Sequence, residues 1–279
     1  MDRPLVDGST KLIGIAGHPI AQVLTPTIMS ALCRRNGVNA LCVPLHVEPA
    51  GLAALLAGLR GMHNLLGVIA TVPHKQAAAA LADTQLPRAR QARAANVLRR
   101  GADGRWSADM LDGVGFIAAL RAAGHEPRGK RALVAGAGGV ATAICFALAE
   151  AGAAEIALFD SDAARAEDLV GRLRAEGADA CLAGPDPAGF GLVLNATPLG
   201  MRPEDPMAID PARLDPTAIA ADVVNKPAVT KFLLAAQARG CAILPGARMT
   251  EHQMAAMAKF YDFPDADWSP AAIHALGMK

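Results

Sequence analysis

The sequence predicts an α/β protein of two domains, the second of which contains a doubly wound parallel sheet. Three observations lead to this prediction. The chain has 279 residues, which is more than one typical hydrophobic core requires and less than three. Short apolar runs alternate with helical stretches, and strands that alternate with helices pair in parallel through crossover helices. A glycine-rich turn joins a strand to a helix in the middle of the chain.

The first part of the chain is expected to form a parallel sheet with helical connections. A helix begins at Thr25 because proline is favoured at the first helical position, here Pro26, and Gly37 ends it. The alanine-rich stretch after Lys75 is also expected to be helical. The expected strands are residues 11–17, 39–47 and 65–72, and a further helix is expected at residues 50–60.

The second part is expected to form a doubly wound sheet whose strands are joined by right-handed helical crossovers. Such a sheet binds ligands at the carboxyl ends of its strands. A helix follows Phe116 as far as Gly124, and the tail from Met249 is helical. Beyond the strand, turn and helix of residues 130–152, strands are expected at residues 154–160, 190–197, 218–224 and 241–246, and helices at 168–177 and 229–240.

Charge and cysteine usage exclude several classes of protein. With 27 Lys and Arg against 26 Asp and Glu, the net charge is +1, so we expect no nucleic acid and no anionic membrane as partner. The five cysteines stand singly, without a CxxC motif or a histidine at metal-ligand spacing. We therefore expect free thiols in a reducing cytoplasm and no metal site. The N-terminus has no apolar segment typical of a secretory signal.

One uncharged stretch, Ala132–Ala149, has to be tested as a membrane span. Its 18 residues approach the ~20 that cross a bilayer. Glycine and alanine dominate it, which makes it only weakly hydrophobic. A buried strand, a glycine turn and a buried helix explain the stretch better.

The glycine turn has the arrangement G-x-G-x-x-A, with Gly136, Gly138 and Gly139, and Ala141 where a third glycine often stands. In such a turn the first glycine permits the tight bend, and the second lets backbone amides approach a pyrophosphate at the helix N-terminus. The motif alone is weak. Here it follows an expected strand and opens an expected helix, which together predict a Rossmann-type dinucleotide site.

Asp160 ends the next expected strand, 24 residues after Gly136. An acidic residue about 20 residues beyond the turn accepts the hydroxyls of the adenosine ribose and repels a 2′-phosphate. Arg165 follows, but no arginine comes directly after the acid. We therefore expect NAD as cofactor rather than NADP. The alternative is an aspartate that caps the following helix.

The chain as a whole resembles the shikimate dehydrogenase family. The matching motifs occur in the order found in the family and cover residues 11 to about 255. Since an ordered set is more specific than any one motif, the chain is identified as a member. The motifs are GHPIAQVLTP, ATVPHK, AANVL, DGVGF, GAGGVATA, NATPLGM, ADVVNKP and GARMTEHQ.

The resemblance implies that Lys75 and Asp112 are catalytic. Lys75 in ATVPHK matches the lysine that acts as acid and base at the substrate hydroxyl, and Asp112 in DGVGF matches its aspartate partner. Oxidation of a secondary alcohol requires a group that removes the hydroxyl proton while hydride leaves the carbon. A solvated lysine that opens a helix is the alternative. His74 is expected to be a surface or capping histidine.

The resemblance also implies the substrate and cofactor contacts. Thr71 and Asn96 match substrate-binding residues, and Gln253 matches a glutamine on the helix that closes over the substrate. Asn195 and Thr197 match positions near the nicotinamide ribose. Gly246 and Met249 match positions that border the nicotinamide, although Met249 could equally be ordinary helix packing.

The chain departs from the family pattern at the substrate carboxylate. The family has two serines before a proline, whereas VLTP provides Val23 and keeps one hydroxyl at Thr25. Asn225 replaces a tyrosine, and Met110 and Leu111 replace an asparagine and a threonine. Each lost charge-assisted hydrogen bond weakens discrimination by ~1.5–3 kcal/mol. Residues that could supply a substitute contact are Gln22, His18, Arg248 and His252.

The expected domains are an N-terminal α/β substrate domain, residues 1–112 completed by 246–279, and a Rossmann-type NAD(P)-binding domain, residues 113–245. The leading hypothesis is an NAD-dependent enzyme that interconverts a secondary alcohol and a ketone on a shikimate- or quinate-like cyclic hydroxy acid. An NAD-binding regulatory or sensor protein is the alternative, and a folate-type dehydrogenase leaves two motifs unexplained. The partner is a small-molecule substrate, and both a monomer and a homodimer remain open.

Overall fold

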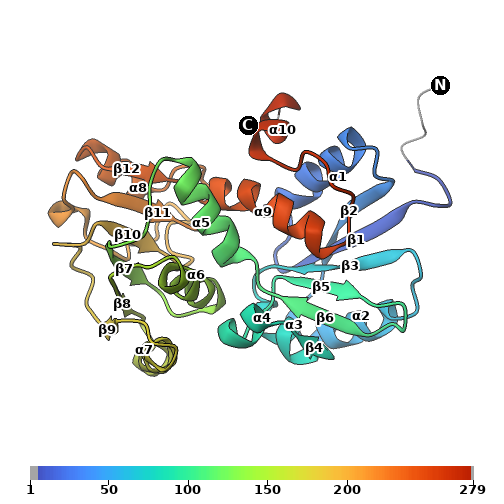
Figure 1. Ribbon diagram of the computed structural model, residues 1–279, viewed down its shortest axis with the longest axis horizontal. Helices are drawn as coiled ribbons and strands as arrows, with labels where there is room; N and C mark the ends of the chain where they lie inside the picture. Colours follow the sequence, from blue (N-terminus) through green and yellow to red (C-terminus); the bar gives the residue numbers. More distant parts are fainter. Residues whose placement is uncertain (1–5, 278–279) are drawn as a thin grey trace. The chain divides into compact units, whose positions relative to one another are not determined.

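The computed structural model describes residues 6–277, which divide into two compact units (Figure 1). Unit 2 is the continuous segment Asp112–Gln253. Unit 1 contains the described residues before this segment and those from Met254 onward. Helix α9 (Gly246–Phe260) therefore begins in unit 2 and ends in unit 1.

The first three strands of unit 1 form the parallel arrangement that the sequence predicts. Strand β1 (Lys11–Gly17) lies between β2 (Ala40–His46) and β3 (Leu65–Ala70) and pairs in parallel with both. Helix α1 (Thr25–Arg35) begins with Pro26 in its first turn, as expected. Helix α2 (Leu52–Leu59) follows the short 3₁₀ turn Pro49–Gly51.

The rest of this sheet is mixed rather than parallel, which the sequence analysis did not predict. Strand β5 (Val97–Arg100) pairs antiparallel with β3, and β6 (Trp106–Asp109) pairs antiparallel with β5. A five-residue connection containing Gly104 at φ +79° closes this hairpin. The sheet order is β2-β1-β3-β5-β6-β4. The remaining elements are α3 (Lys75–Leu81), β4 (Thr84–Gln85) and α4 (Pro87–Ala92).

The C-terminal segment packs into unit 1. Tyr261 is buried, and a Cβ atom at Gly67 would lie 2.6 Å from its ring. Asp262 forms an ion pair with Arg99 of β5. The Asn36 side-chain amide donates to the Asp267 carbonyl at 3.0 Å, just before helix α10 (Pro270–Ala275). Unit 1 is therefore built from both ends of the chain.

Unit 2 contains the doubly wound sheet that the sequence predicts. Its six strands are all parallel, in the order β12-β11-β10-β7-β8-β9. The strand order reverses between β7 and β10, which is where such sheets bind ligands. The strands are β7 (Arg131–Ala135), β8 (Glu155–Phe159), β9 (Ala180–Leu182), β10 (Leu192–Asn195), β11 (Ile219–Asp222) and β12 (Ala242–Leu244).

Two helices of unit 2 begin earlier than expected. Helix α5 (Asp112–Ala122) starts at Asp112 rather than after Phe116. Helix α7 (Ala163–Ala175) starts five residues before Asp168, because the Asp162 side chain caps it by accepting from the Arg165 amide. The other elements are α6 (Gly139–Glu150), α8 (Lys231–Ala238) and the 3₁₀ turn Pro211–Arg213.

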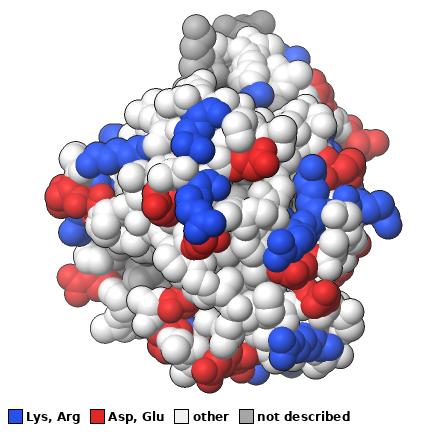
Figure 2. Space-filling model, turned by 90° about the vertical axis from the view of Figure 1, so that its left-hand side faces the viewer, with Lys and Arg blue, Asp and Glu red and all other residues white. Residues whose placement is uncertain are grey.

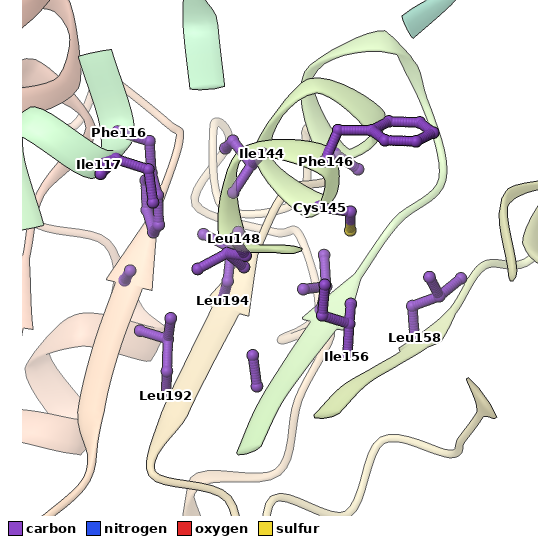
Figure 3. Close-up of a cluster of buried hydrophobic side chains, with 14 of the residues drawn as sticks. Phe116, Ile117, Ile144, Cys145, Phe146, Leu148, Ile156, Leu158, Leu192 and Leu194 are labelled. Atoms are coloured by element: carbon purple, nitrogen blue, oxygen red, sulfur yellow. The ribbon is translucent and has the colours of Figure 1, made fainter. Parts of the chain in front are cut away.

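Apolar residues cover both faces of this sheet. Leu158 and Leu194 face a cluster that includes α5 and α6, whereas Val193 faces a second cluster (Figure 3). Alternation of this kind places successive side chains of one strand on opposite faces. The uncharged stretch Ala132–Ala149 is accordingly strand β7, the glycine turn and most of helix α6. Within residues 6–277, no helix is long and apolar enough to cross a membrane.

The charged side chains on one face of the molecule are mixed in sign. Figure 2 shows Lys and Arg side chains interspersed with Asp and Glu over this face. This distribution matches the net charge of +1. It differs from the basic stripe or patch that is typical of nucleic-acid binding.

Candidate active site

The glycine turn between β7 and α6 has the geometry that a dinucleotide requires. Gly136 has φ +107°, and a Cβ atom there would lie 3.0 Å from the Ala196 carbonyl oxygen. A Cβ atom at Gly138 would meet nothing within 4 Å, so this side of the turn is open. Helix α6 begins at Gly139 and has no side-chain cap. Its first amides can therefore receive an anion, and these residues fit a pyrophosphate.

Asp160 lies directly beside this turn. One carboxylate oxygen, Oδ2, accepts from the Ala137 amide at 2.7 Å, and Oδ1 accepts from the Asp162 amide at 2.8 Å. The following helix is capped by Asp162, so the alternative interpretation of Asp160 as its cap is wrong. Arg165 pairs with Asp162 at 3.1 Å. The loop after β8 therefore presents two carboxylates, and its arginine is already paired.

Asn195 and Thr197 stand at the carboxyl end of β10. The Asn195 amide donates to the Leu199 carbonyl at 2.9 Å and to Asp222 at 3.1 Å. Its oxygen accepts from the Thr197 amide at 3.1 Å and from the Thr197 hydroxyl at 2.6 Å. An asparagine side chain has two N–H donors and an oxygen with two lone pairs. Asn195 uses all of them, three within its own loop and one to Asp222 at the end of β11.

Asp112 and Gln253 meet inside unit 2. The Gln253 amide donates to Asp112 Oδ1 at 3.0 Å, and both side chains are buried. Close packing of α5 against α9 brings them together, since a Cβ atom at Gly115 would lie 2.3 Å from Gln253 Cγ. The glutamine thus fixes the orientation of the carboxylate that the sequence analysis assigns to catalysis.

The start of helix α9 is packed against the loop that follows β11. A Cβ atom at Gly246 would lie 2.5 Å from the Val224 carbonyl oxygen, so only glycine fits without a shift. Met249 is buried and belongs to the larger apolar cluster of unit 2. Met249 thus has a role in helix packing, which is the alternative to its expected place beside the nicotinamide.

In unit 1, the candidate substrate residues follow the carboxyl ends of neighbouring strands. The Thr71 amide donates to the Ala16 carbonyl of β1 at 3.0 Å, and a Cβ atom at Gly17 would lie 2.5 Å from Thr71 Cγ2. Thr25 is buried and is the first residue of α1. These threonines are therefore held by the backbone at the ends of β1 and β3 and at the start of α1.

Lys75 and Asn96 are linked through the backbone of unit 1. Lys75 is the first residue of α3, and its carbonyl accepts from the Ala95 amide at 2.8 Å. The Asn96 side-chain oxygen accepts from the Leu111 amide at 2.8 Å. The backbone amide of Asn96 donates to the Asp109 carbonyl at 3.1 Å. Asn96 is thereby anchored within unit 1.

His74 occupies the N-cap position of α3, but it is buried and its side chain makes no capping hydrogen bond, so the expected surface or capping role of the side chain is wrong. Its side chain is 1% exposed, and Nε2 lies 2.8 Å from the Val47 carbonyl oxygen. No side-chain cap precedes α3. The histidine joins the loop before Lys75 to the segment after β2, and this contact between distant segments has no local sequence signal.

Several residues proposed as substitutes for the carboxylate clamp have partners of their own. The Gln22 amide donates to the Pro19 carbonyl at 2.9 Å, and Arg248 pairs with Glu251 at 3.1 Å. His18 stacks on His46, with Nδ1 and Nε2 separated by 3.0 Å. Asn225 accepts from the Thr250 hydroxyl at 3.2 Å. The suggested substitutes and the altered residue Asn225 thus take part in the protein's own contacts.

Other chemistry finds little support in residues 6–277. They contain no group of three or more His, Cys, Asp or Glu residues that could hold a metal ion. The five cysteines are unpaired. Burial raises the pKa of Cys33, Cys42 and Cys145 to about 12, so these thiols stay protonated and are poor nucleophiles near neutral pH.

The sequence is similar to curated shikimate dehydrogenases. A family model described as the shikimate dehydrogenase substrate binding domain matches residues 15–98. A shikimate dehydrogenase (NADP(+)) of Rubrobacter xylanophilus is 38% identical over 259 residues, which is 91% of each chain. One of Methylobacterium radiotolerans is 41% identical over 247 residues, which is 86% of each chain.

Solved structures share the whole architecture. A Listeria monocytogenes shikimate 5-dehydrogenase in complex with shikimate and NAD has a TM-score of 0.86 at 30% identity and covers 98% of both chains. A quinate dehydrogenase from Corynebacterium glutamicum in complex with NAD has a TM-score of 0.83 at 27% identity, over 95% of this chain and 99% of that one. A 5-ketofructose reductase of Gluconobacter has a TM-score of 0.82 at 28% identity, over 96% and 99%.

The fold and the glycine turn define a two-domain oxidoreductase, with an N-terminal substrate-binding domain and a Rossmann-like domain. Within that class, the identity to curated enzymes over nine-tenths of the chain settles the family. The chain belongs to the shikimate dehydrogenase family, whose members act on CH–OH groups.

Proposed function

We propose that the protein is a nicotinamide-dinucleotide-dependent dehydrogenase that interconverts a secondary alcohol and a ketone on a shikimate- or quinate-like cyclic hydroxy acid. The observation that carries this proposal is the open glycine turn, with Asp160 hydrogen-bonded beside it. The names of related proteins support it, since curated relatives are called shikimate dehydrogenases and a similar structure contains shikimate.

The proposal assigns proton transfer to Lys75 and Asp112. When bound, the dinucleotide supplies or accepts the hydride. Lys75 takes the proton from the substrate hydroxyl in the oxidative direction and returns it in the reductive one. Asp112 is proposed as the second residue of this proton transfer, and the hydrogen bond from Gln253 fixes the orientation of its carboxylate. The remaining substrate contacts are proposed for Thr25, Thr71 and Asn96.

The proposed cofactor is NAD. Asp160 and Asp162 make the loop after β8 acidic, and Arg165 is paired with Asp162 rather than available to a 2′-phosphate. The curated relatives are named as NADP(+) enzymes, and the similar structures include complexes with NAD and complexes with NADP. The acidic loop after β8 is the feature of this chain that favours NAD over NADP, because its negative charge repels a 2′-phosphate.

A direct assay tests the proposed reaction. Purified protein is given NAD or NADP with shikimate, quinate and related hydroxy acids, and the reduced nicotinamide is followed by absorbance. We expect turnover with NAD and at least one acid. Lys75→Ala is expected to lower kcat by at least about 100-fold, because the proton acceptor is lost, with an unchanged Kd for NAD.

Two results would contradict this proposal. Normal turnover by Lys75→Ala would exclude the lysine as the proton acceptor. NAD binding without turnover on any acid would favour the alternative, a regulatory or sensor protein. That alternative is favoured by one observation, the replacement of carboxylate-binding positions by Val23 and Asn225.

A further inference from the structure

The carboxylate of Asp222 joins two loops at the carboxyl end of the unit 2 sheet. Asp222 is the last residue of β11 and lies opposite Asn195, the last residue of β10. Its Oδ2 accepts from the Asn195 amide at 3.1 Å and from the Thr230 hydroxyl at 2.8 Å, and its Oδ1 accepts from the Val224 amide at 2.9 Å. One side chain thus holds β10, the loop after β11 and the start of α8.

The hydrogen-bond partners of Asp222 are donors, which favours an ionised carboxylate. The Thr230 hydroxyl donates its proton to Asp222, and its oxygen accepts from the Leu233 amide at 3.3 Å. Burial raises the pKa of Asp222, and the hydrogen bonds from Val224, Asn195 and Thr230 oppose that rise. A buried charge that is fully hydrogen-bonded fixes the geometry around it, since any shift leaves a polar group unpaired.

The two loops held by Asp222 contact the other candidate cofactor positions. The loop after β10 packs on the glycine turn, because a Cβ atom at Gly136 would lie 3.3 Å from Thr197 Cγ2. The loop after β11 packs on the start of α9, with its Val224 carbonyl 2.5 Å from a Cβ atom at Gly246. A shift of Asp222 would therefore displace the loop after β10 and the loop after β11 together.

A doubly wound sheet binds a dinucleotide with one nucleotide on each half. The half containing β7 and β8 carries the glycine turn and Asp160, which suit the adenosine side. The ends of β10 and β11 then face the nicotinamide side. We infer that Asp222 is a positioning residue that sets the nicotinamide-side loops through Asn195 and Thr230; this inference rests on the proposed function.

The test compares binding of NAD and ADP by calorimetry to the wild type and to Asp222→Asn. In the variant an NH₂ group must face at least one former donor, so at least one hydrogen bond is lost while the side-chain volume is kept. We expect the Kd for NAD to rise about tenfold, the loss of about one hydrogen bond to a charged group, and the Kd for ADP to change less than about twofold. General destabilisation would weaken both ligands alike.

Thr230 provides a second variant and a matched control should Asp222→Asn not fold. Thr230→Val removes the hydroxyl at nearly constant shape and should reproduce the selective loss of NAD binding, whereas Thr230→Ser keeps the hydroxyl and should bind NAD like the wild type. Equal losses for NAD and ADP, or no loss for either, would overturn the role of Asp222. A wild type that binds neither ligand would overturn the proposed function, and the inference with it.

Discussion

At the residue scale, Asp160 and Asp162 in the loop after β8 have different roles. Asp160 accepts from the Ala137 amide of the glycine turn, whereas Asp162 caps α7 and pairs with Arg165. Asp160 therefore both shapes the turn and presents charge beside it. Because of this double task, a change in cofactor affinity alone would not identify a contact with the ribose. The ratio of NAD to NADP use separates the two effects, since both cofactors need the turn.

We predict that Asp160→Ala lowers the ratio of kcat/KM for NAD to kcat/KM for NADP by about tenfold, because a hydrogen-bonded charge next to the 2′ position is removed. Steady-state kinetics with both cofactors measures this ratio. Asp168→Ala is the control, since it removes a charge that pairs with Arg172 on the surface of α7. An unchanged ratio in Asp160→Ala would rule out the selective role.

At the element scale, local pattern predicted most strands but not the hairpin of unit 1. Strands such as β1 and β7 are apolar runs and were located closely. The β5–β6 hairpin was missed, although Gly101-Ala-Asp-Gly104 between two apolar–polar runs is a turn signal. Helix α7 likewise begins earlier than its apolar pattern predicts, because Asp162 caps it.

The same limit applies to the candidate site. Glycines and strand-ending residues can be found from motif and spacing, and the structure brings Asp112 and Gln253 together in unit 2. The contact of His74 with Val47 and the hydrogen bond between Asn195 and Asp222 could not be predicted, because each joins positions 27 residues apart. Hydrogen bonds between distant segments are settled by tertiary packing, which leaves no local periodicity.

The close contact of α5 and α6 leads to a prediction with opposite signs at two glycines. A Cβ atom at Gly113 would lie 2.3 Å from the Ala143 carbonyl oxygen, whereas one at Gly171 in α7 would meet nothing within 4 Å. Gly113→Ala should lower the free energy of unfolding by about 1–3 kcal/mol through overpacking. Gly171→Ala should raise it by about 0.5–1 kcal/mol. Urea denaturation measures the free energy of unfolding of both variants. A Gly113→Ala protein with the free energy of unfolding of the wild type would contradict the packing argument.

At the scale of the whole molecule, the buried cysteines report on each unit separately. Cys33 and Cys42 lie in unit 1 and Cys145 lies in unit 2. Because burial raises the pKa of each thiol to about 12, the native protein keeps them protonated and shielded at pH 8. The thiols react only when the unit around them opens.

We predict that all three cysteines become reactive at the same urea concentration. Helix α9 belongs to both units, so the loss of either unit removes half of a helix that the other needs. Pulsed alkylation followed by mass spectrometry of the labelled peptides measures each cysteine. Separate midpoints for Cys145 and for the pair Cys33 and Cys42 would show that the units unfold independently.

The discontinuity of unit 1 also has a consequence for synthesis on the ribosome. Gly67, Arg99 and Asn36 are synthesised long before their partners Tyr261, Asp262 and Asp267. Unit 2 is continuous in sequence and is therefore fully translated before unit 1 is complete. Until those partners are synthesised, part of the apolar surface of the nascent N-terminal segment stays exposed, and chaperones bind such surfaces. These contacts of unit 1 therefore form only after the whole of unit 2 has been translated.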